Sequence, residues 1–305
     1  MIAIDLGSNS FRAISFDCTS LSIIDEYEAI VKTADKLHQN GEISEGAVER
    51  IIHALQEADK KLHFQEHTVK AVTTQAMRKA RNSAAVLKAL EQKSGVAFEI
   101  IGAEKEAYYT LTAVEARLKA LEIKHDHFVL IDVGGGSTEI IFYRNGVMES
   151  QSFPIGIVTT AQICDEGCDM QGYLDEAFKP LCSYVEGYYE KYAKPATFVA
   201  TAGTPTTMAA YLLGMSYKNY DVQKINGYRL SLEGTKEALN GLMALSEMAR
   251  AEIVGVGRES LIQAGIIIVQ KLYATLGSTE AIVIDDGVRE GVAIAYCNSI
   301  KERRD

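Results

Sequence analysis

The sequence predicts an α/β protein that contains two similar domains. Strand-like apolar runs alternate with helix-like runs in both halves of the chain, which is typical of α/β domains. Each half also begins with a small-residue turn between two strand-like runs, DLGSNSFR from Asp5 and DVGGGSTE from Asp132. Because both copies place Asp, a glycine turn and a second strand in the same order, they indicate a duplicated domain.

The first half is expected to contain three strands and then alternating helices and strands. Ser44 precedes a helix-like run and is expected to cap it, since serine is favoured at that position. The expected strands lie near residues 2–6, 11–17, 21–30, 69–74 and 97–101, and the expected helices cover about 44–62, 75–93 and 104–121.

The second half repeats this order. Asn145-Gly146 is a strong hairpin signal after the second glycine turn. Helices are expected at about 174–192 and after Thr204, and strands at 196–201 and 281–285. No Gly/Ser-rich or Pro-rich linker separates the halves, so the repeat alone sets the domain limits. We expect domains at 1–124 and 125–305, with a C-terminal helix at about 288–305 that can pack back on the first domain.

Composition narrows the possible partners and compartments. The net charge of −10 argues against a nucleic-acid-binding protein, which needs a basic face. The start of the chain lacks a basic segment before its apolar run, and the later apolar run at 265–269 is too short to span a bilayer, so we expect neither a signal peptide nor a membrane partner. The odd number of five cysteines does not predict a disulfide framework and favours the cytoplasm.

Glycine-rich turns expose successive backbone N–H groups, which form anion-binding concavities. A third such turn, AGT from Ala202, stands between a strand and a helix, whose N-terminus adds partial positive charge. One turn alone is equally well explained as an ordinary hairpin, but three together favour a phosphate site. The expected phosphate-binding residues are Gly7, Ser8, Asn9, Ser10, Gly134, Gly135, Gly136, Ser137, Thr138, Gly203 and Thr204.

Six motifs in order give the chain a family resemblance. They are DLGSNSFR at Asp5, TTQAMRKARN at Thr73, IIGAEKEAYY at Ile100, IDVGGGSTE at Ile131, TAGTPTT at Thr201 and GVREG at Gly287. With them the chain resembles the exopolyphosphatase and guanosine pentaphosphate phosphohydrolase family, within the actin, sugar kinase and 70-kDa heat-shock superfold. The resemblance covers essentially the whole chain and implies two ribonuclease-H-like domains around a central cleft.

The resemblance also implies an activity and a set of site residues. It implies hydrolysis of the terminal phosphoanhydride of inorganic polyphosphate or guanosine pentaphosphate, with Mg²⁺ or another divalent cation. The resemblance implies that Glu106 is the catalytic base and that Arg78 contacts phosphate. Asp132 and Glu139 are expected to serve the metal and the attacking water, with Asp5 as a further metal ligand. Without the resemblance, Arg78 reads as part of a solvated basic helix face and Glu106 as an ordinary acidic residue near a helix start.

Two alternatives remain open at this point. One is a small-molecule kinase of the same superfold, and the other is a polyphosphate or alarmone sensor that binds without turnover. Lys105 stands where the family often has glutamate, which bears on substrate preference, and the chain resembles the family's short form. The sequence ranks neither polyphosphate above guanosine pentaphosphate nor a monomer above a homodimer.

Overall fold

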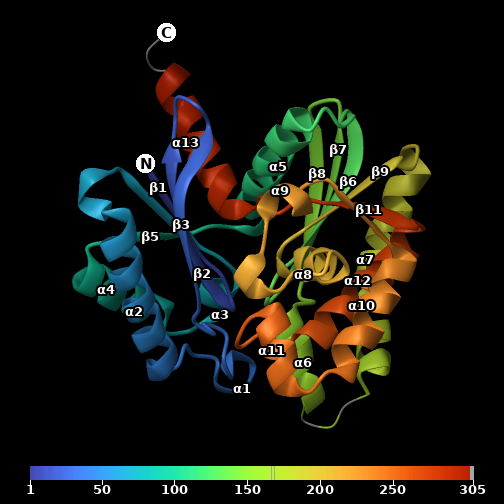
Figure 1. The fold of residues 1–305 in the computed structure, drawn as a ribbon, viewed down its shortest axis with the longest axis horizontal. Helices are drawn as coiled ribbons and strands as arrows, with labels where there is room; N and C mark the ends of the chain where they lie inside the picture. The colour runs from blue at the N-terminus through green and yellow to red at the C-terminus, as the bar shows by residue number, and fades with distance from the viewer. Residues whose placement is uncertain (166, 168, 303–305) are drawn as a thin grey trace. The chain divides into compact units, whose positions relative to one another are not determined.

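A computed structural model describes residues 1–165, 167 and 169–302 (Figure 1). The chain forms two compact units, which we call unit 1 (Met1–Val114 and Asp286–Asp305) and unit 2 (Glu115–Asp285). The units divide within the helix Ala103–Ala120, whereas the boundary expected after residue 124 lies beyond its end. The domain limits 1–124 and 125–305 therefore stay a prediction.

Unit 1 is built on a five-stranded sheet in the order β3-β2-β1-β4-β5. The first three strands are antiparallel, and β4 and β5 run parallel to β1. The strands are β1 (Ile2–Leu6), β2 (Ser10–Asp17), β3 (Ser22–Ile30), β4 (Val69–Thr73) and β5 (Phe98–Ile100). The helices are α1 (Leu37–Asn40), α2 (Glu45–Leu62), η1 (Phe64–Glu66), α3 (Gln75–Lys79), α4 (Ser83–Ser94), α5 (Ala103–Ala120), which continues into unit 2, and α13 (Val288–Glu302).

Unit 2 is built on a six-stranded sheet in the order β10-β11-β9-β6-β7-β8. The strands are β6 (His127–Val133), β7 (Thr138–Arg144), β8 (Val147–Phe153), β9 (Thr197–Thr201), β10 (Tyr228–Ser231) and β11 (Glu280–Val283). The helices are α6 (Ile157–Asp165), α7 (Met170–Lys191), α8 (Gly203–Leu212), η2 (Tyr217–Asn219), α9 (Val222–Ile225), α10 (Leu232–Ala244), α11 (Glu247–Val254) and α12 (Ile262–Leu276).

The two sheets share one topology. In each, three antiparallel strands in chain order are extended by strands that run parallel to the first, so β3-β2-β1-β4-β5 corresponds to β8-β7-β6-β9-β11. The strand β10 adds an antiparallel edge to unit 2 alone. The predicted α/β class with a duplicated domain is confirmed.

The sequence pattern explains the elements on either side of the turns. The central strands β1 and β6 are almost wholly buried, as continuous apolar runs in a covered sheet should be. Ser44 caps α2 as predicted, since its hydroxyl accepts the Ala47 N–H at 3.2 Å. Asn145 and Gly146 form the predicted hairpin turn between β7 and β8, both with positive φ.

The continuous helix expected over 75–93 is wrong. The chain forms α3 and α4 instead, with a break at residues 80–82. The Asn82 side-chain amide exchanges two 2.9 Å hydrogen bonds with the backbone of Ile43, and the Arg81 N–H donates to the Gly41 carbonyl. These bonds to a loop far away in the sequence hold residues 80–82 outside the helical pattern.

The cysteine count predicted no disulfide framework and did not reveal the disulfide that the structure contains. Cys18, just after β2, is bonded to Cys297 in α13, across a sequence separation of 279 residues. The helix α13 packs on β1 and β2 of the same unit, where it adds Val292 and Ala293 to a core that includes Ile14 (Figure 1). Such a pairing follows from the fold and cannot be read from cysteine spacing. In the described part of the chain, no helix combines the length and apolarity needed to cross a membrane.

Candidate functional site

The two predicted glycine turns have the same backbone geometry. In unit 1 the Gly7 N–H donates to the Ser10 carbonyl, and in unit 2 the Gly134 N–H donates to the Ser137 carbonyl, both at 2.9 Å. Each turn joins the first two strands of its sheet. The similarity noticed in the sequence is therefore a similarity of structure.

In the second turn, two successive backbone N–H groups point in the same direction. The carbonyls of Gly134 and Gly135 accept hydrogen bonds of 3.0 and 2.9 Å from the N–H groups of Ile157 and Val158 at the start of α6. No peptide bond among the described residues is cis, so within each planar peptide of this turn the N–H points opposite to the carbonyl. The N–H groups of Gly135 and Gly136 therefore point away from α6 and make a concavity suited to an anion.

The first turn has a similar arrangement, shifted by one residue along the chain. The Ser8 carbonyl accepts from the Ala34 N–H at 2.8 Å, and the Asn9 carbonyl accepts from Val31 at 2.9 Å. By the same geometry, the N–H groups of Asn9 and Ser10 point away from the segment after β3. Both predicted turns can thus offer paired amides to phosphate oxygens.

Gly156 packs closely against the backbone of the second turn. A Cβ atom at Gly156 would lie 2.3 Å from the Gly135 carbonyl oxygen and 2.4 Å from the Gly136 Cα. Only glycine fits so close to another backbone. Sequence reasoning missed this residue, although it stands directly before the helix that holds the turn.

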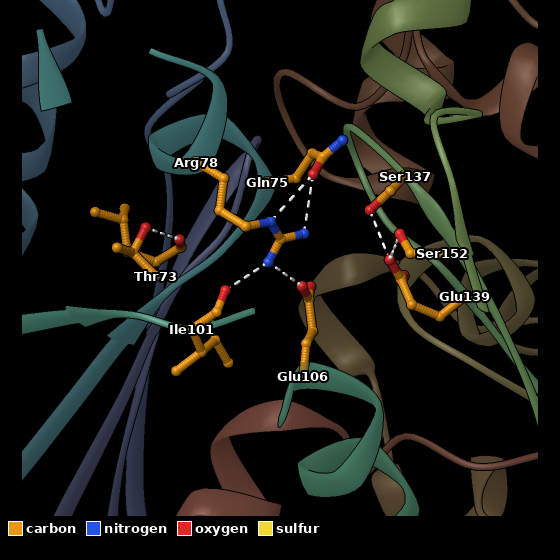
Figure 2. Close-up of polar contacts among 9 residues, drawn as sticks. Thr73, Gln75, Arg78, Ile101, Glu106, Ser137, Glu139 and Ser152 are labelled. Atoms are coloured by element: carbon orange, nitrogen blue, oxygen red, sulfur yellow. Dashed lines mark hydrogen bonds and ion pairs between the residues drawn. The ribbon is translucent and has the colours of Figure 1, made fainter. Parts of the chain in front are cut away.

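The hydroxyls of the second turn bond inside unit 2. Ser137 donates to Glu139 Oε1 at 2.8 Å, and Thr138 donates to the Ile155 carbonyl at 2.6 Å (Figure 2). Ser152 on β8, which stands opposite Glu139, donates to the same Oε1 at 2.7 Å. A role of Ser137 and Thr138 in phosphate binding therefore falls to their backbone. The side chain of Glu139 is buried, and the two hydroxyls offset the cost of burying its charge.

Asp132 and Glu139 stand directly opposite each other on β6 and β7. Like charges at opposed positions destabilise a sheet unless a cation compensates them. Mg²⁺ commonly binds through one or two carboxylates together with phosphate oxygens and water, so this pair fits a divalent cation by its donor chemistry. Among the residues that the structure describes, no group of three or more His, Cys, Asp or Glu side chains is placed to hold a metal.

The equivalent positions in unit 1 carry a different charge pattern. Asp5 stands opposite Arg12, which occupies the place that Glu139 has in the second copy. Arg12 Nε lies 3.4 Å from Glu28 Oε1 on the next strand. Since the residue opposite Asp5 is basic, whereas the residue opposite Asp132 is acidic, the geometry supports Asp132 and Glu139 as metal ligands more than it supports Asp5.

Arg78 and Glu106, expected from the resemblance, are joined in unit 1. Arg78 Nη1 donates to Glu106 Oε2 at 2.7 Å and to the Ile101 carbonyl at 2.7 Å (Figure 2). Its Nε and Nη2 donate to Gln75 Oε1 at 3.2 and 2.9 Å. The side chains of Arg78 and Glu106 are only 18% and 10% exposed, so Arg78 is not the solvated helix face of the alternative interpretation.

The third turn begins α8 at Gly203. Ala202 before it has a φ of 71°, which is uncommon for a residue with a side chain, and no side chain caps the helix. The Thr204 side chain is buried against α12, where a Cβ at Gly265 would lie 2.3 Å from Thr204 Oγ1. Gly203 and Thr204 can therefore offer a phosphate their backbone N–H groups, next to the positive end of the helix dipole.

Sequence reasoning missed two side chains that bond to predicted site residues, Ser152 to Glu139 and Gln75 to Arg78. Ser152 could have been found, because counting back across the Asn145-Gly146 turn places it opposite Glu139. Gln75 carries no such signal, since its approach to Arg78 depends on the short helix α3.

Comparison with known proteins decides the family. The model of the Ppx/GppA phosphatase family matches residues 14–299. The chain belongs to this family. It is 27% identical over 321 residues to Exopolyphosphatase 2 of Mycobacterium tuberculosis, covering 96% of this chain and 97% of that protein.

Two further members of the family are similar to this Ppx/GppA phosphatase. Guanosine-5'-triphosphate,3'-diphosphate pyrophosphatase of Aeromonas hydrophila is 24% identical over 95% of this chain, which spans 58% of that protein. The crystal structure of the Aquifex aeolicus family member is 30% identical, with a TM-score of 0.71 over 99% of this chain and 97% of that one.

Proposed function

We propose that this Ppx/GppA phosphatase is an exopolyphosphatase that hydrolyses the terminal phosphoanhydride bond of inorganic polyphosphate. The observation that carries the proposal is the pair of matching turns, in which carbonyls bonded to the segment behind them direct successive N–H groups outward. A chain of phosphates presents repeated anionic oxygens, which such amides can bind without a basic surface. This suits a protein whose net charge is −10.

Glu106 is the proposed catalytic base. It accepts the proton of a water whose oxygen attacks the terminal phosphorus, while the bridging P–O bond breaks and the shortened polyphosphate leaves with the electron pair. A glutamate is a weak base at neutral pH, so its main contribution is to orient the water. Arg78 fixes the carboxylate for this role through the 2.7 Å bond to Oε2.

Asp132 and Glu139 are the proposed ligands of a divalent cation. Bound there, a cation would offset charge on the phosphate oxygens, which is the main demand of phosphoryl transfer. Ser137 and Ser152 keep Glu139 oriented by donating to its Oε1. The other carboxylate, Asp132, stands opposite on β6.

Guanosine pentaphosphate is the second candidate substrate. The likeness to the Aeromonas hydrophila pyrophosphatase favours this substrate. The terminal phosphoanhydride of guanosine pentaphosphate would be hydrolysed by the same chemistry. The experiment is side-by-side phosphate release from polyphosphate and guanosine pentaphosphate, with no acceptor added. Release from polyphosphate supports the proposal, release from guanosine pentaphosphate alone favours the second candidate, and binding without release would identify a sensor. Phosphate transfer that requires an added acceptor would identify a kinase. The cytoplasmic location and the lack of nucleic-acid or membrane partners stay predictions.

A further inference from the structure

Gln75 holds the outer edge of the Arg78 guanidinium. It is the first residue of α3, directly after Thr74 and close to the end of β4. One oxygen, Oε1, accepts both the Nε–H and an Nη2–H of Arg78. Figure 2 shows the amide nitrogen of Gln75 directed away from Arg78. The strand end itself is fixed, because the Thr73 hydroxyl donates to the Leu6 carbonyl of β1 at 2.8 Å.

The opposite part of the guanidinium holds Glu106. Both hydrogens of Nη1 are used, one by the Ile101 carbonyl and one by Glu106 Oε2, each at 2.7 Å. A guanidinium is planar and has five N–H donors in a rigid fork. Fixing the Nε and Nη2 edge therefore also fixes the direction in which Nη1 meets the carboxylate.

This geometry changes the role expected for Arg78, which was contact with phosphate. Four of its hydrogen bonds end on Gln75, Ile101 and Glu106, so one of the five N–H donors is left for a phosphate oxygen. Arg78 therefore serves chiefly to position Glu106. A positioning arginine works only if its own plane is held, because its long side chain otherwise samples several rotamers.

We propose that Gln75 is a positioning residue of the catalytic base: by holding Arg78 in plane, it sets the orientation of the Glu106 carboxylate toward the attacking water. This inference rests on the proposed function of Glu106. Gln75 touches neither the carboxylate nor the reacting atoms in this arrangement, so its effect passes through Arg78. The consequence is a turnover defect without a binding defect, because the phosphate-binding amides lie on other segments.

The test compares Gln75→Ala and Gln75→Glu with the wild-type protein in steady-state phosphate release from polyphosphate. Gln75→Ala should lower kcat by about 10- to 100-fold, the scale of a catalytic group displaced by roughly 1 Å, with KM nearly unchanged. Gln75→Glu keeps an oxygen that accepts from both Arg78 donors and should restore most of kcat. If the Gln75 amide nitrogen acted directly on the substrate, Gln75→Glu would be as slow as Gln75→Ala.

Gln92→Ala is the matched control, since Gln92 is an exposed glutamine of α4 in the same unit. Thermal unfolding of each variant separates loss of fold from loss of position. A Gln75→Ala protein that folds and keeps the wild-type kcat would overturn the proposed role of Gln75 but leave the proposed function standing. A rise in KM with kcat unchanged would also overturn it. A wild-type protein that releases no phosphate from polyphosphate or guanosine pentaphosphate would instead overturn the proposed function, and the role of Gln75 with it.

Discussion

Asp132 and Glu139 face each other across β6 and β7, while the equivalent positions of the first copy pair Asp5 with Arg12. The second hairpin thus places two acidic residues opposite each other, whereas the first places an acidic residue opposite a basic one. Because two carboxylates in such a position repel each other, the second hairpin is the one that gains from a cation. The two hairpins share the turn hydrogen bond but differ in the charges beside it.

A first prediction concerns this carboxylate pair. Glu139→Gln should weaken divalent-cation binding, measured as Mn²⁺ affinity by electron paramagnetic resonance, and should lower phosphate release at limiting Mg²⁺. Chelation should abolish release in the wild-type protein, and added Mg²⁺ should restore it. Glu176→Gln, at an exposed position on α7, is the control. Unchanged cation affinity in Glu139→Gln would remove Glu139 from the metal site.

A second prediction concerns the support of the second turn. Gly156→Ala places a Cβ 2.3 Å from the Gly135 carbonyl, so the turn must shift and polyphosphate binding should weaken at least tenfold, or about 1.4 kcal/mol. Gly187→Ala in α7 is the control, because a Cβ there meets nothing within 4 Å. That change should stabilise the helix by about 0.5–1 kcal/mol. Equal binding by the two variants would show that the turn does not hold the phosphates.

A third prediction concerns Ser152. Ser152→Ala removes one of the two serine donors to Glu139 Oε1 and should destabilise the fold by about 1–3 kcal/mol, the cost of leaving a buried acceptor under-satisfied. The measurement is urea unfolding of the purified variant. Ser150→Ala, on the same strand opposite Ile141, should change stability little. Wild-type stability of Ser152→Ala would argue that water replaces the hydroxyl.

A fourth prediction concerns the disulfide between Cys18 and Cys297. Cross-linking residues so far apart in sequence restricts the unfolded chain, and a native disulfide is typically worth about 2–5 kcal/mol. Cys18→Ser should therefore lower the free energy of unfolding by that amount under oxidising conditions. Reduction should have the same effect on the wild-type protein and none on the variant. Cys182→Ser, which removes a free cysteine, is the control for loss of a thiol.

Local pattern was sufficient for much of the fold. The paired turns, the Ser44 cap and the Asn145-Gly146 hairpin each depend on residues close in sequence, and the structure contains all three. The break at residues 80–82 could not be predicted, because Asn82 bonds to Ile43 on a loop 39 residues away. The disulfide was missed for the same reason.

In the candidate site, too, features that depend on neighbouring residues could be predicted and features that depend on distant residues could not. The turns could be predicted from their glycine content, and their role as anion sites stays a prediction. The arrangement around the acidic residues could not be predicted, because it depends on tertiary contacts. Arg78 was expected to meet phosphate, and the structure directs its donors to Glu106, Ile101 and Gln75. A sequence motif identifies such residues without saying which of them bonds to which.

The role of Glu106 as the catalytic base can be measured by comparing Glu106→Gln with the wild-type protein for both phosphate release and polyphosphate binding. The substitution keeps the shape and a hydrogen-bond acceptor for Arg78 but removes the carboxylate that takes a proton. Phosphate release should fall by about 10²- to 10⁴-fold, the usual worth of a positioned acid–base group. Equilibrium binding of polyphosphate should stay the same or tighten, because a negative charge is lost near a polyanion. Near-normal release by a folded Glu106→Gln protein would show that Glu106 is not the catalytic base.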